Sequence, residues 1–426
     1  MQRRTFLLGA GLAPLAAGAA NDSVGIGIIG LGGRGRDHLH YYSKLPGARV
    51  VAICDVNQAQ TERAAQMAQR LGGSQPQAYQ DLRKLFDDKN VDAVSIATPN
   101  HWHALATIWA CQAGKDVYCE KPACYNLFEG REMQAAARAH QRIVQIGTQG
   151  RSLVHKQRAI ELLHSGAIGQ IYMARGICFK RRRSIGHTPN EPVPAGLNWD
   201  LFLGPAPMRP YTKNRYQYNW HWFWDTGNGD IGNQGIHEMD LARWGLGRDL
   251  PKAAVSTGGK YVYADDQETP NTQIATFDYG DAELVFEVRG LNTGGEPGIP
   301  ASGPNFVGAT FFGSNGFMAV DEHGFEIFLG DKREPGESMK HAETEIDDTI
   351  PHMANFLKAV KSRKPADLNA DVAVGVTSAA LVHLANISYR VGRKLNFDSA
   401  AGKFIGDDEA NAMSTRPVYR SPYIVS

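Results

Sequence analysis

Cysteine, net charge and long apolar runs are all scarce in this sequence, and each scarcity excludes a class of protein. The 426 residues include five cysteines, an odd number without a Cys-x-x-Cys pair, which argues against a disulfide framework and against a zinc site. Lysine and arginine number 45 against 44 acidic residues, so no strong field attracts nucleic acid or anionic membranes. After residue 20 there is no run of about 18 apolar residues, the length that a membrane-spanning helix needs.

What is present is an ordinary globular composition with extra glycine. Hydrophobic residues make up 42% and charged residues 21%, which excludes a disordered or fibrous chain. The length suggests two domains with sizeable cores. The 46 glycines are about 11% of the chain, against a usual share of about 7%, so many tight turns or close backbone approaches are expected.

The first twenty residues differ from the rest of the chain. Arg3 and Arg4 precede an apolar run rich in alanine and glycine, and no acidic residue occurs before Asp22. This pattern is typical of a twin-arginine signal peptide with a cleavage site near Ala19. We therefore expect residues 1–20 to direct export to the periplasm and to leave no membrane anchor once removed. A cytoplasmic protein with two chance arginines is the alternative.

A glycine-rich turn follows the first strand-like run, at residues 24–29. Its sequence, Gly30-Leu31-Gly32-Gly33-Arg34-Gly35, has the G-x-G-x-x-G spacing of a dinucleotide-binding turn. Gly30 permits the tight turn, Gly32 lets the backbone approach a pyrophosphate, and Gly35 lets the next helix pack closely on its strand. The first amides of that helix then face the phosphates.

An acidic residue ends the second strand-like run, at residues 50–55. Asp55 lies twenty residues after Gly35, where a carboxylate accepts hydrogen bonds from the adenosine ribose and repels a 2′-phosphate. The pair of signals predicts NAD as the cofactor, with NADP less favoured. The alternative for Asp55 is an exposed turn acid without a ligand.

Strand-like and helical runs alternate up to about residue 149. The pattern predicts further strands at 93–98, 116–119 and 143–147, separated by helices at 61–71, 104–113 and 128–140. This alternation is typical of a doubly wound parallel sheet, the Rossmann arrangement. Ligands bind at the carboxyl ends of such strands, which places Thr98-Pro99-Asn100 and Glu120-Lys121-Pro122 at the site.

Lys121 precedes a proline and is therefore held extended at its strand end, where its ammonium group can reach a substrate hydroxyl. A solvated turn is the alternative for a Lys-Pro pair taken alone. The turn at Gly30 with Asp55, the run Ala97-Thr98-Pro99-Asn100-His101-Trp102-His103, and Cys119-Glu120-Lys121-Pro122 together resemble the glucose-fructose oxidoreductase, inositol dehydrogenase and rhizopine-catabolism (Gfo/Idh/MocA) family. The resemblance implies that Lys121 is catalytic and that residues 97–103, His103 included, lie at the cofactor edge.

The second half reads as an α+β domain. A helix at 155–165 is followed by strand-like runs at 272–279, 282–288, 309–313, 316–320 and 325–328, which predict a large, open, mainly antiparallel sheet. The family resemblance implies the same layout and a homo-oligomer, a dimer or tetramer, formed through that sheet. We therefore divide the chain into a signal peptide at 1–20, an NAD-binding domain at 21–149, a substrate-binding and oligomerisation domain at 150–400, and an extended tail at 401–426.

A histidine at the start of a helix provides a proton acceptor. His237 follows a glycine-rich segment, and family members carry an acid four residues before this histidine, where the present sequence has Asn233. Asn233 can orient a hydroxyl or the imidazole but cannot supply negative charge. Asp240, three residues past His237, or Asp230 is expected to supply it. The alternative for His237 is a helix cap bonded to backbone.

Six aromatic residues crowd residues 216–224. Apolar sugar faces stack on such rings, so we expect Tyr218, Trp220 and Trp222 to bind substrate, with Gln149 and Arg151 as further candidates. A packing cluster between the domains is the alternative. Histidines 101, 103 and 221 lack the spacing of metal ligands, so no catalytic metal is expected.

These residues predict an NAD-dependent oxidoreductase that acts on a hydroxyl of a sugar, polyol or glycoside, with C3 of a pyranoside as the expected position. Because the periplasm has no pool of free NAD, an exported enzyme needs a tightly bound cofactor. Two alternatives stay open: a redox-neutral, NAD-dependent glycoside hydrolase or lyase that passes through a 3-keto intermediate, and a non-catalytic protein that binds NAD or sugar.

Overall fold

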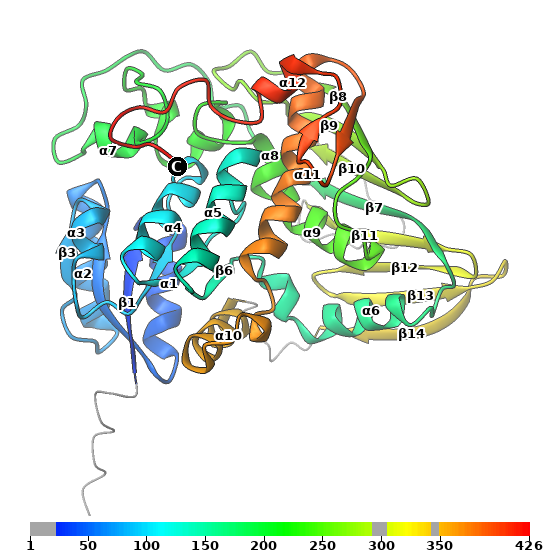
Figure 1. Ribbon diagram of the computed structural model, residues 1–426, viewed down its shortest axis with the longest axis horizontal. Helices are drawn as coiled ribbons and strands as arrows, with labels where there is room; N and C mark the ends of the chain where they lie inside the picture. Colours follow the sequence, from blue (N-terminus) through cyan, green and yellow to red (C-terminus); the bar gives the residue numbers. More distant parts are fainter. Residues whose placement is uncertain (1–22, 292–304, 342–348) are drawn as a thin grey trace, which may run out of the picture.

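Two sheets, each covered by helices, divide the chain between them (Figure 1). The computed structural model describes residues 23–291, 305–341 and 349–426. The predicted signal peptide lies outside the described residues.

The first half is a six-stranded sheet with the strand order β3-β2-β1-β4-β5-β6, and all of its neighbouring strands are parallel. This is the predicted doubly wound arrangement, which places a ligand crevice beyond the carboxyl ends of β1 and β4. Its elements are β1 (Val24–Ile29), α1 (Gly33–Lys44), β2 (Ala48–Cys54), α2 (Gln58–Arg70), β3 (Gln77–Tyr79), α3 (Leu82–Phe86), β4 (Ala93–Ile96), η2 (Asn100–Trp102), α4 (His103–Gln112), β5 (Asp116–Cys119), α5 (Leu127–Ala139), β6 (Val144–Ile146) and η3 (Gln149–Ser152).

The second half is built on a ten-stranded sheet with the order β14-β13-β12-β11-β7-β10-β9-β8-β15-β16, antiparallel except where β10 lies parallel to β7. The predicted α+β class is therefore confirmed. Its strands are β7 (Ile171–Phe179), β8 (Ala253–Gly259), β9 (Thr272–Asp278), β10 (Glu283–Arg289), β11 (Phe306–Gly313), β12 (Gly316–Asp321), β13 (Gly324–Leu329), β14 (Glu334–Lys340), β15 (Leu395–Asp398) and β16 (Lys403–Phe404).

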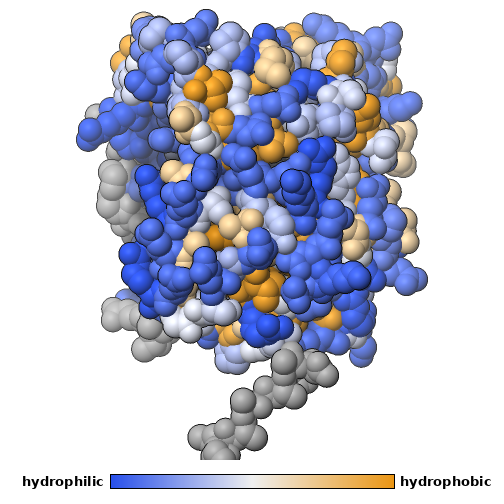
Figure 2. All heavy atoms as spheres, turned by 90° about the vertical axis from the view of Figure 1, so that its left-hand side faces the viewer, coloured by the Kyte–Doolittle hydropathy of each residue, from blue (hydrophilic) through white to orange (hydrophobic). Residues whose placement is uncertain are grey.

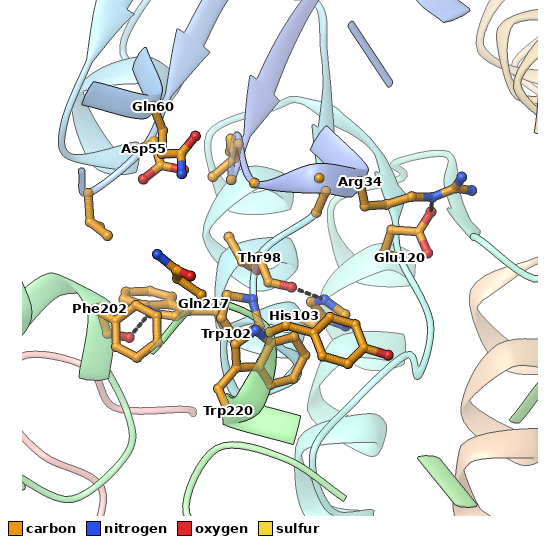
Figure 3. Close-up of a pocket in the computed structure, with 18 of the residues that line it drawn as sticks. Arg34, Asp55, Gln60, Thr98, Trp102, His103, Glu120, Phe202, Gln217 and Trp220 are labelled. Carbon is orange, nitrogen blue, oxygen red and sulfur yellow. Dashed lines mark hydrogen bonds and ion pairs between the residues drawn. The ribbon is translucent and has the colours of Figure 1, made fainter. Parts of the chain in front are cut away.

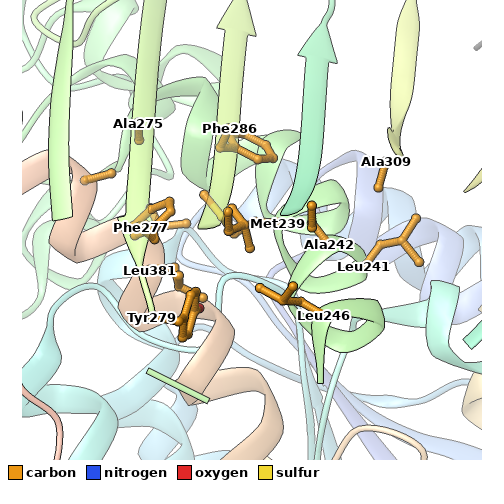
Figure 4. Packing of buried hydrophobic residues seen from close by; sticks show 14 of the residues in the cluster. Met239, Leu241, Ala242, Leu246, Ala275, Phe277, Tyr279, Phe286, Ala309 and Leu381 are labelled. Atoms are coloured by element: carbon orange, nitrogen blue, oxygen red, sulfur yellow. The ribbon is translucent and has the colours of Figure 1, made fainter. Parts of the chain in front are cut away.

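Helices that follow or interrupt the second sheet cover one of its faces. Met239 and Leu246 of α9 and Leu381 of α11 pack against Phe277 of β9 and Phe286 of β10 in one apolar cluster (Figure 4). The helices of this half are α6 (Val154–His164), α7 (Trp199–Leu203), η4 (Lys213–Arg215), η5 (Gln217–Trp222), α8 (Gly229–Asn233), α9 (Gly235–Leu246), α10 (Thr349–Ser362), η6 (Pro365–Asp367), α11 (Val372–Val391) and α12 (Asp408–Ala412).

Helix α11 is the one described helix long and apolar enough to cross a membrane by length and composition. The most apolar 18-residue window of α11 is 78% buried inside the protein, where it separates the two sheets (Figure 1). A core helix of a two-sheet protein meets the same apolar criterion, because it is covered on all sides.

Helices from late in the chain also complete the core of the first sheet. Met353 and Phe356 of α10 lie in the same apolar cluster as Ile28 of β1 and Tyr118 of β5. The ring nitrogen Nε2 of His352 lies 2.8 Å from the carbonyl oxygen of Ile146, at the end of β6. The outer face of this first half, over α2 and α3, is mostly hydrophilic with apolar side chains in small groups (Figure 2).

The C-terminal tail differs from the extended segment that the sequence predicted for residues 401–426. It contains β16 and α12, and its last residues return to the first half (Figure 1). Tyr423 is 2% exposed and packs edge-on against Trp102, with their ring centroids 5.5 Å apart. Its hydroxyl donates a hydrogen bond to Oδ2 of Asp200, at 2.6 Å. Apolar contacts, hydrogen bonds and the ion pairs of Arg416 with Glu129 and of Arg420 with Asp200, which sequence spacing did not reveal, hold the tail in place.

Replacing Tyr423 with alanine should destabilise the first half by about 3 kcal/mol, because it removes a buried aromatic ring and leaves a cavity. Urea unfolding of the purified protein measures the effect. Val418 of the same tail is 76% exposed, so Val418→Ala is the matched control and should leave the midpoint in place. Equal midpoints for both variants would mean that the tail does not stabilise the fold.

Candidate functional site

A cavity of about 820 Å³ lies beyond the carboxyl ends of β1, β2 and β4. It runs from Asp55 at one end to Lys121 and His237 at the other, so both halves of the chain line it. In Figure 3, Phe202, Gln217 and Trp220 face the strand ends across this space, while Arg34 and Glu120 lie at the end opposite Asp55.

The glycine-rich turn leaves room along one side of the cavity. Gly30 has a φ of 83°, and a Cβ atom on Gly35 would lie 1.7 Å from the carbonyl oxygen of Gly30. Gly32 and Gly33, in contrast, have nothing within 4 Å of an added Cβ atom. Helix α1 begins at Gly33, which lines the cavity, and no side chain caps the first amides of the helix. The cradle fits the pyrophosphate of NAD.

Asp55 is positioned by two backbone amides. The amide of Leu31 donates to Oδ2 at 2.6 Å, and the amide of Asn57 donates to Oδ1 at 2.8 Å. Burial raises the pKa of Asp55 to about 6, although both hydrogen bonds oppose the shift. Leu31 contributes only its backbone here, because its side chain is fully buried in the core. Arg36, which the sequence reasoning missed, donates to Gln60 at 2.9 Å and lines the cavity near Asp55.

The side chain of His103 holds the predicted Thr98-Pro99-Asn100 turn in place. Both ring nitrogens of His103 lie near carbonyl oxygens, Nε2 2.8 Å from that of Thr98 and Nδ1 2.7 Å from that of Pro122. Thr98, Pro99 and His103 line the cavity, but Asn100 does not. The side-chain nitrogen Nδ2 of Asn100 is buried and donates a hydrogen bond to Oδ1 of Asn228. Asn100 therefore connects the two halves of the chain instead of binding the cofactor directly.

Glu120 is a buried carboxylate with two cationic or proton-donating partners. Its Oε1 lies 2.8 Å from Nε of Arg34 and 2.9 Å from Nε2 of His38. Burial alone would raise the pKa of Glu120, but Arg34 and the hydrogen bond from His38 hold it well below its usual range. Glu120 is therefore ionised and balances the charge of the adjacent Lys121.

Lys121 crosses from the first half to the second. Its Nζ donates a hydrogen bond to the backbone oxygen of Asn233, at 2.9 Å. Burial lowers the pKa of Lys121, and the carboxylate of Glu120 opposes the shift. The ammonium group is thus fixed at the end of α8, in the same cavity as His237.

His237 lines the cavity from the first turn of α9, and its ring makes no hydrogen bond to any residue that the structure describes. Burial, and to a lesser extent Lys121, lower the pKa of His237 well below its ordinary value. The imidazole is therefore neutral near pH 7, and it can accept a proton from a substrate hydroxyl.

Asp230, the other acid expected to supply negative charge, lies one turn before Asn233 and does not line the main cavity. Asp230 forms a two-point ion pair with Arg182, with Oδ1 2.7 Å from Nη2 and Oδ2 2.9 Å from Nε. The side-chain nitrogen of Asn233 lies 3.4 Å from Oδ1 of Asp230 and donates to the hydroxyl of Tyr218 at 2.9 Å. Arg182 also donates to that hydroxyl, at 3.0 Å.

Asp240 was predicted to supply negative charge beside His237, and Arg151 to contact the substrate, but the structure pairs them with each other. Oδ2 of Asp240 lies 2.7 Å from Nε of Arg151, both side chains are buried, and Ser378 donates a further hydrogen bond to Asp240. Neither residue lines the main cavity. A fully satisfied buried ion pair has a structural role, so Asp240 is not the charge that assists His237.

The aromatic segment divides between the two roles proposed for it. Tyr218 and Trp220 line the cavity, and so does Gln149, as predicted. Trp222 is 3% exposed and does not reach the cavity, because it packs beneath Arg182. Sequence reasoning missed two residues that line the cavity: Phe202, from a segment with no motif of its own, and Gln217, a polar residue inside the aromatic segment. Only the tertiary contacts reveal them.

Two family models match the chain. One, described as an oxidoreductase family with an NAD-binding Rossmann fold, matches residues 24–148. The other, described as the C-terminal alpha/beta domain of an oxidoreductase family, matches residues 171–280 and 327–425.

Similar proteins include dehydrogenases and a protein of a glycosyl hydrolase family. A levoglucosan dehydrogenase of Pseudarthrobacter phenanthrenivorans is 29% identical over 53% of this chain and 52% of its own length. A glycosyl hydrolase family 109 protein of Saccharopolyspora erythraea is 28% identical over 44% of each chain, so the chain matches only about half the length of these relatives. A solved levoglucosan dehydrogenase in complex with NADH and levoglucosan shares the fold, with a TM-score of 0.67 at 18% identity over 88% of this chain and 99% of the other.

The affinity for NAD should depend on the ionisation of Asp55. Above a pH of about 6 the ionised carboxylate accepts hydrogen bonds from ribose hydroxyls, and below it the protonated form has lost that charge. The dissociation constant of NAD should therefore rise as the pH falls through about 6. Calorimetric titration of protein stripped of its cofactor measures this dependence.

The matched variant is Asp55→Asn, which should weaken NAD binding about tenfold and make it insensitive to pH in this range. It should also narrow the preference for NAD over NADP, because the charge that repels the 2′-phosphate is gone. An Asp55→Asn variant that kept the wild-type pH profile would show that another group controls binding.

Proposed function

Because the chain belongs to the Gfo/Idh/MocA family of NAD-binding oxidoreductases, we propose that it oxidises a ring hydroxyl of a sugar or glycoside. One observation carries the proposal. The ammonium group of Lys121 and the neutral imidazole of His237, which come from different halves of the chain, line one end of the cavity whose other end holds Asp55.

The chain's own residues account for the handling of the cofactor and the proton. Gly32, Gly33 and the start of α1 would hold the pyrophosphate, and Asp55 the adenosine ribose. NAD, when bound, supplies a hydride acceptor. Lys121 donates a hydrogen bond to the substrate hydroxyl and stabilises its developing negative charge, while His237 accepts the proton.

Asn233 and Tyr218 would position the sugar. The side-chain nitrogen of Asn233 donates hydrogen bonds to Tyr218 and Asp230. The side-chain oxygen of Asn233 can therefore accept a hydrogen bond from a substrate hydroxyl. Trp220 offers an aromatic surface in the same cavity. The similarity to levoglucosan dehydrogenase supports a pyranose-like substrate, and we take C3 of a pyranoside as the position of oxidation.

Export would make the cofactor a resident group. With a twin-arginine signal peptide at residues 1–20, the protein would carry NAD to the periplasm already bound. No free NAD is available there for exchange, so a second substrate or the later steps of the same cycle must take the hydride back.

Tyr218 favours a second candidate function, redox-neutral cleavage of a glycoside. Its phenol oxygen accepts hydrogen bonds from Arg182 and Asn233, so its own proton is free to point into the cavity. Such a phenol can act as an acid or base at a second carbon, as the elimination of a glycosidic substituent from a 3-keto sugar requires. The partial match to a glycosyl hydrolase family 109 protein supports the same candidate.

A single experiment tests the proposal and separates the two candidates. Holoprotein is incubated with a panel of glucosides, the absorbance of NADH is followed, and the sugar products are identified by mass. NADH that accumulates together with a keto sugar supports the dehydrogenase. Cleaved glycoside without lasting NADH supports the redox-neutral reaction. Unchanged sugars and cofactor throughout a wide panel would contradict both.

Replacing Lys121 with methionine should lower the rate of NAD reduction by about 10³-fold, because no cation remains to stabilise the hydroxyl as it loses its proton. NAD should stay bound, since the pyrophosphate and ribose contacts are intact. Rapid mixing of holoprotein with substrate measures the rate, and Lys84→Met on an exposed helix is the control. A Lys121→Met variant with wild-type rate would overturn the mechanism.

Restoring the family's acid with Asn233→Asp should lower kcat/KM about tenfold. A second carboxylate would lie near Asp230 and would replace the donor to Tyr218. The double variant Asp230→Asn with Asn233→Asp moves the acid by one turn and should recover most of the loss. A higher kcat/KM for Asn233→Asp alone would show that the present site lacks an acid where the family has one.

A further inference from the structure

A second cavity, of about 570 Å³, lies beside the first. Arg34, Gln149 and His237 line both cavities, so the two meet at the proposed catalytic base. Several further elements form the remaining walls, among them α6, α9, β11 and the end of β12, which contribute Lys156, Glu238, Trp244, Val307 and Asp321. None of these five residues has a role in the reaction described above.

Three buried oxygen atoms of this second cavity have no hydrogen-bond partner among the described residues. They are Oε1 of Gln149, Oε2 of Glu238 and Oδ2 of Asp321. Glu238 and Asp321 are each 6% exposed. A buried polar atom without a partner costs free energy, and the three residues that carry these atoms all line one cavity. The cavity is therefore complementary to a ligand with several hydroxyl groups, which donate to Gln149 and Asp321 and can donate to or accept from Glu238.

The charges in this cavity favour a neutral ligand over a cation. Three cationic residues, Arg34, Arg151 and Lys156, line the space together with four acids, and one of these acids, Asp240, is already paired with Arg151. Burial raises the pKa of Glu238 to about 7 and also raises that of Asp321, so these two acids do not offer a full double negative charge near neutral pH. Among the described residues, no group of three or more histidine, cysteine, aspartate or glutamate side chains is arranged to hold a metal ion.

We propose that the second cavity binds a second sugar ring, the substituent of the ring that is oxidised beside Lys121 and His237. This inference rests on the proposed function and adds to it the substrate class, a glycoside of at least two rings. Hydroxyl groups supply the donors that Gln149, Glu238 and Asp321 lack. Trp244, whose ring centroid lies 4.5 Å from Cζ of Arg151, lines the cavity together with Leu241 and Val307. These side chains provide the apolar surface that a pyranose ring needs.

Because the two cavities meet at His237, one sugar ring would not fill both of them. A single pyranose placed against Lys121 and His237 satisfies the main cavity and leaves the three acceptors beyond them unpaired. A glycosidic substituent that passes His237 reaches them, and Gln149 then contacts both rings, since it lines both cavities.

Binding to protein loaded with NADH, which cannot accept a hydride from the sugar, is measured by calorimetry and tests the inference. The probes are maltose and cellobiose, with methyl α-D-glucopyranoside and methyl β-D-glucopyranoside as their one-ring counterparts. At least one disaccharide should bind about tenfold more tightly than its counterpart, the gain of about one well-made hydrogen bond to a charged or buried group.

Two variants locate the second ring. Glu238→Met keeps the length of the side chain and removes the acceptor, while Asp321→Asn keeps the Oδ1 atom that holds the backbone of His323 and Gly324. Each should reduce the two-ring over one-ring affinity ratio at least threefold. Glu62→Met, on the exposed face of α2, is the matched control and should leave the ratio as it is.

The outcomes distinguish this inference from the proposed function. A ratio near one in the wild type, or a ratio that both variants leave intact, overturns the second-ring site even where the holoprotein reduces its NAD with a one-ring glucoside. Failure of every probe to bind and to reduce NAD overturns the proposed function and this inference together. A high ratio that falls in both variants establishes the second-ring site whichever of the two reactions follows.

Discussion

The hydrogen bond from Lys121 to the backbone of Asn233 is the contact on which the site depends. It joins the end of a parallel strand to the end of α8, and it brings a cation from one half beside a neutral imidazole from the other. Burial would make that cation unfavourable on its own. Glu120 offsets the cost, and Arg34 and His38 in turn keep Glu120 ionised. The same contacts therefore align the two halves and set the charge state of the site.

Local patterns were enough to predict most of the fold. The bounds of β1 and β5 agree with the predicted strands, because each is a short apolar run between clear turn signals. The sequence analysis missed strands β8 and β14, each for a different reason. The first, Ala253–Gly259, is rich in small residues, and the second, Glu334–Lys340, is an exposed edge strand whose polar sequence has no buried face to reveal it. Its backbone pairing with β13, and not its composition, makes this segment a strand.

The site was predictable where chemistry follows the chain and unpredictable where it depends on distant partners. The glycine turn and the acid after β2 have fixed roles in a doubly wound sheet, so their spacing was sufficient. Asp240 looked equally suitable three residues past His237, but Arg151, 89 residues earlier, pairs with it. Trp222 was indistinguishable by type from Trp220, although burial separates them. Residue type identifies the candidate site residues, and long-range contacts determine which of them reach the site.

The return of the C-terminal tail to the first half affects the order in which the protein can be made. Tyr423 and Val425 belong to the same apolar cluster as Trp102 and Leu105, which are synthesised more than 300 residues earlier. A ribosome that is still translating the second sheet therefore holds a first half with part of its core uncovered. The first half can close only when residues 423–425 have left the ribosome, not when the first 149 residues are complete, and a chaperone that shields this apolar surface would have to remain until then.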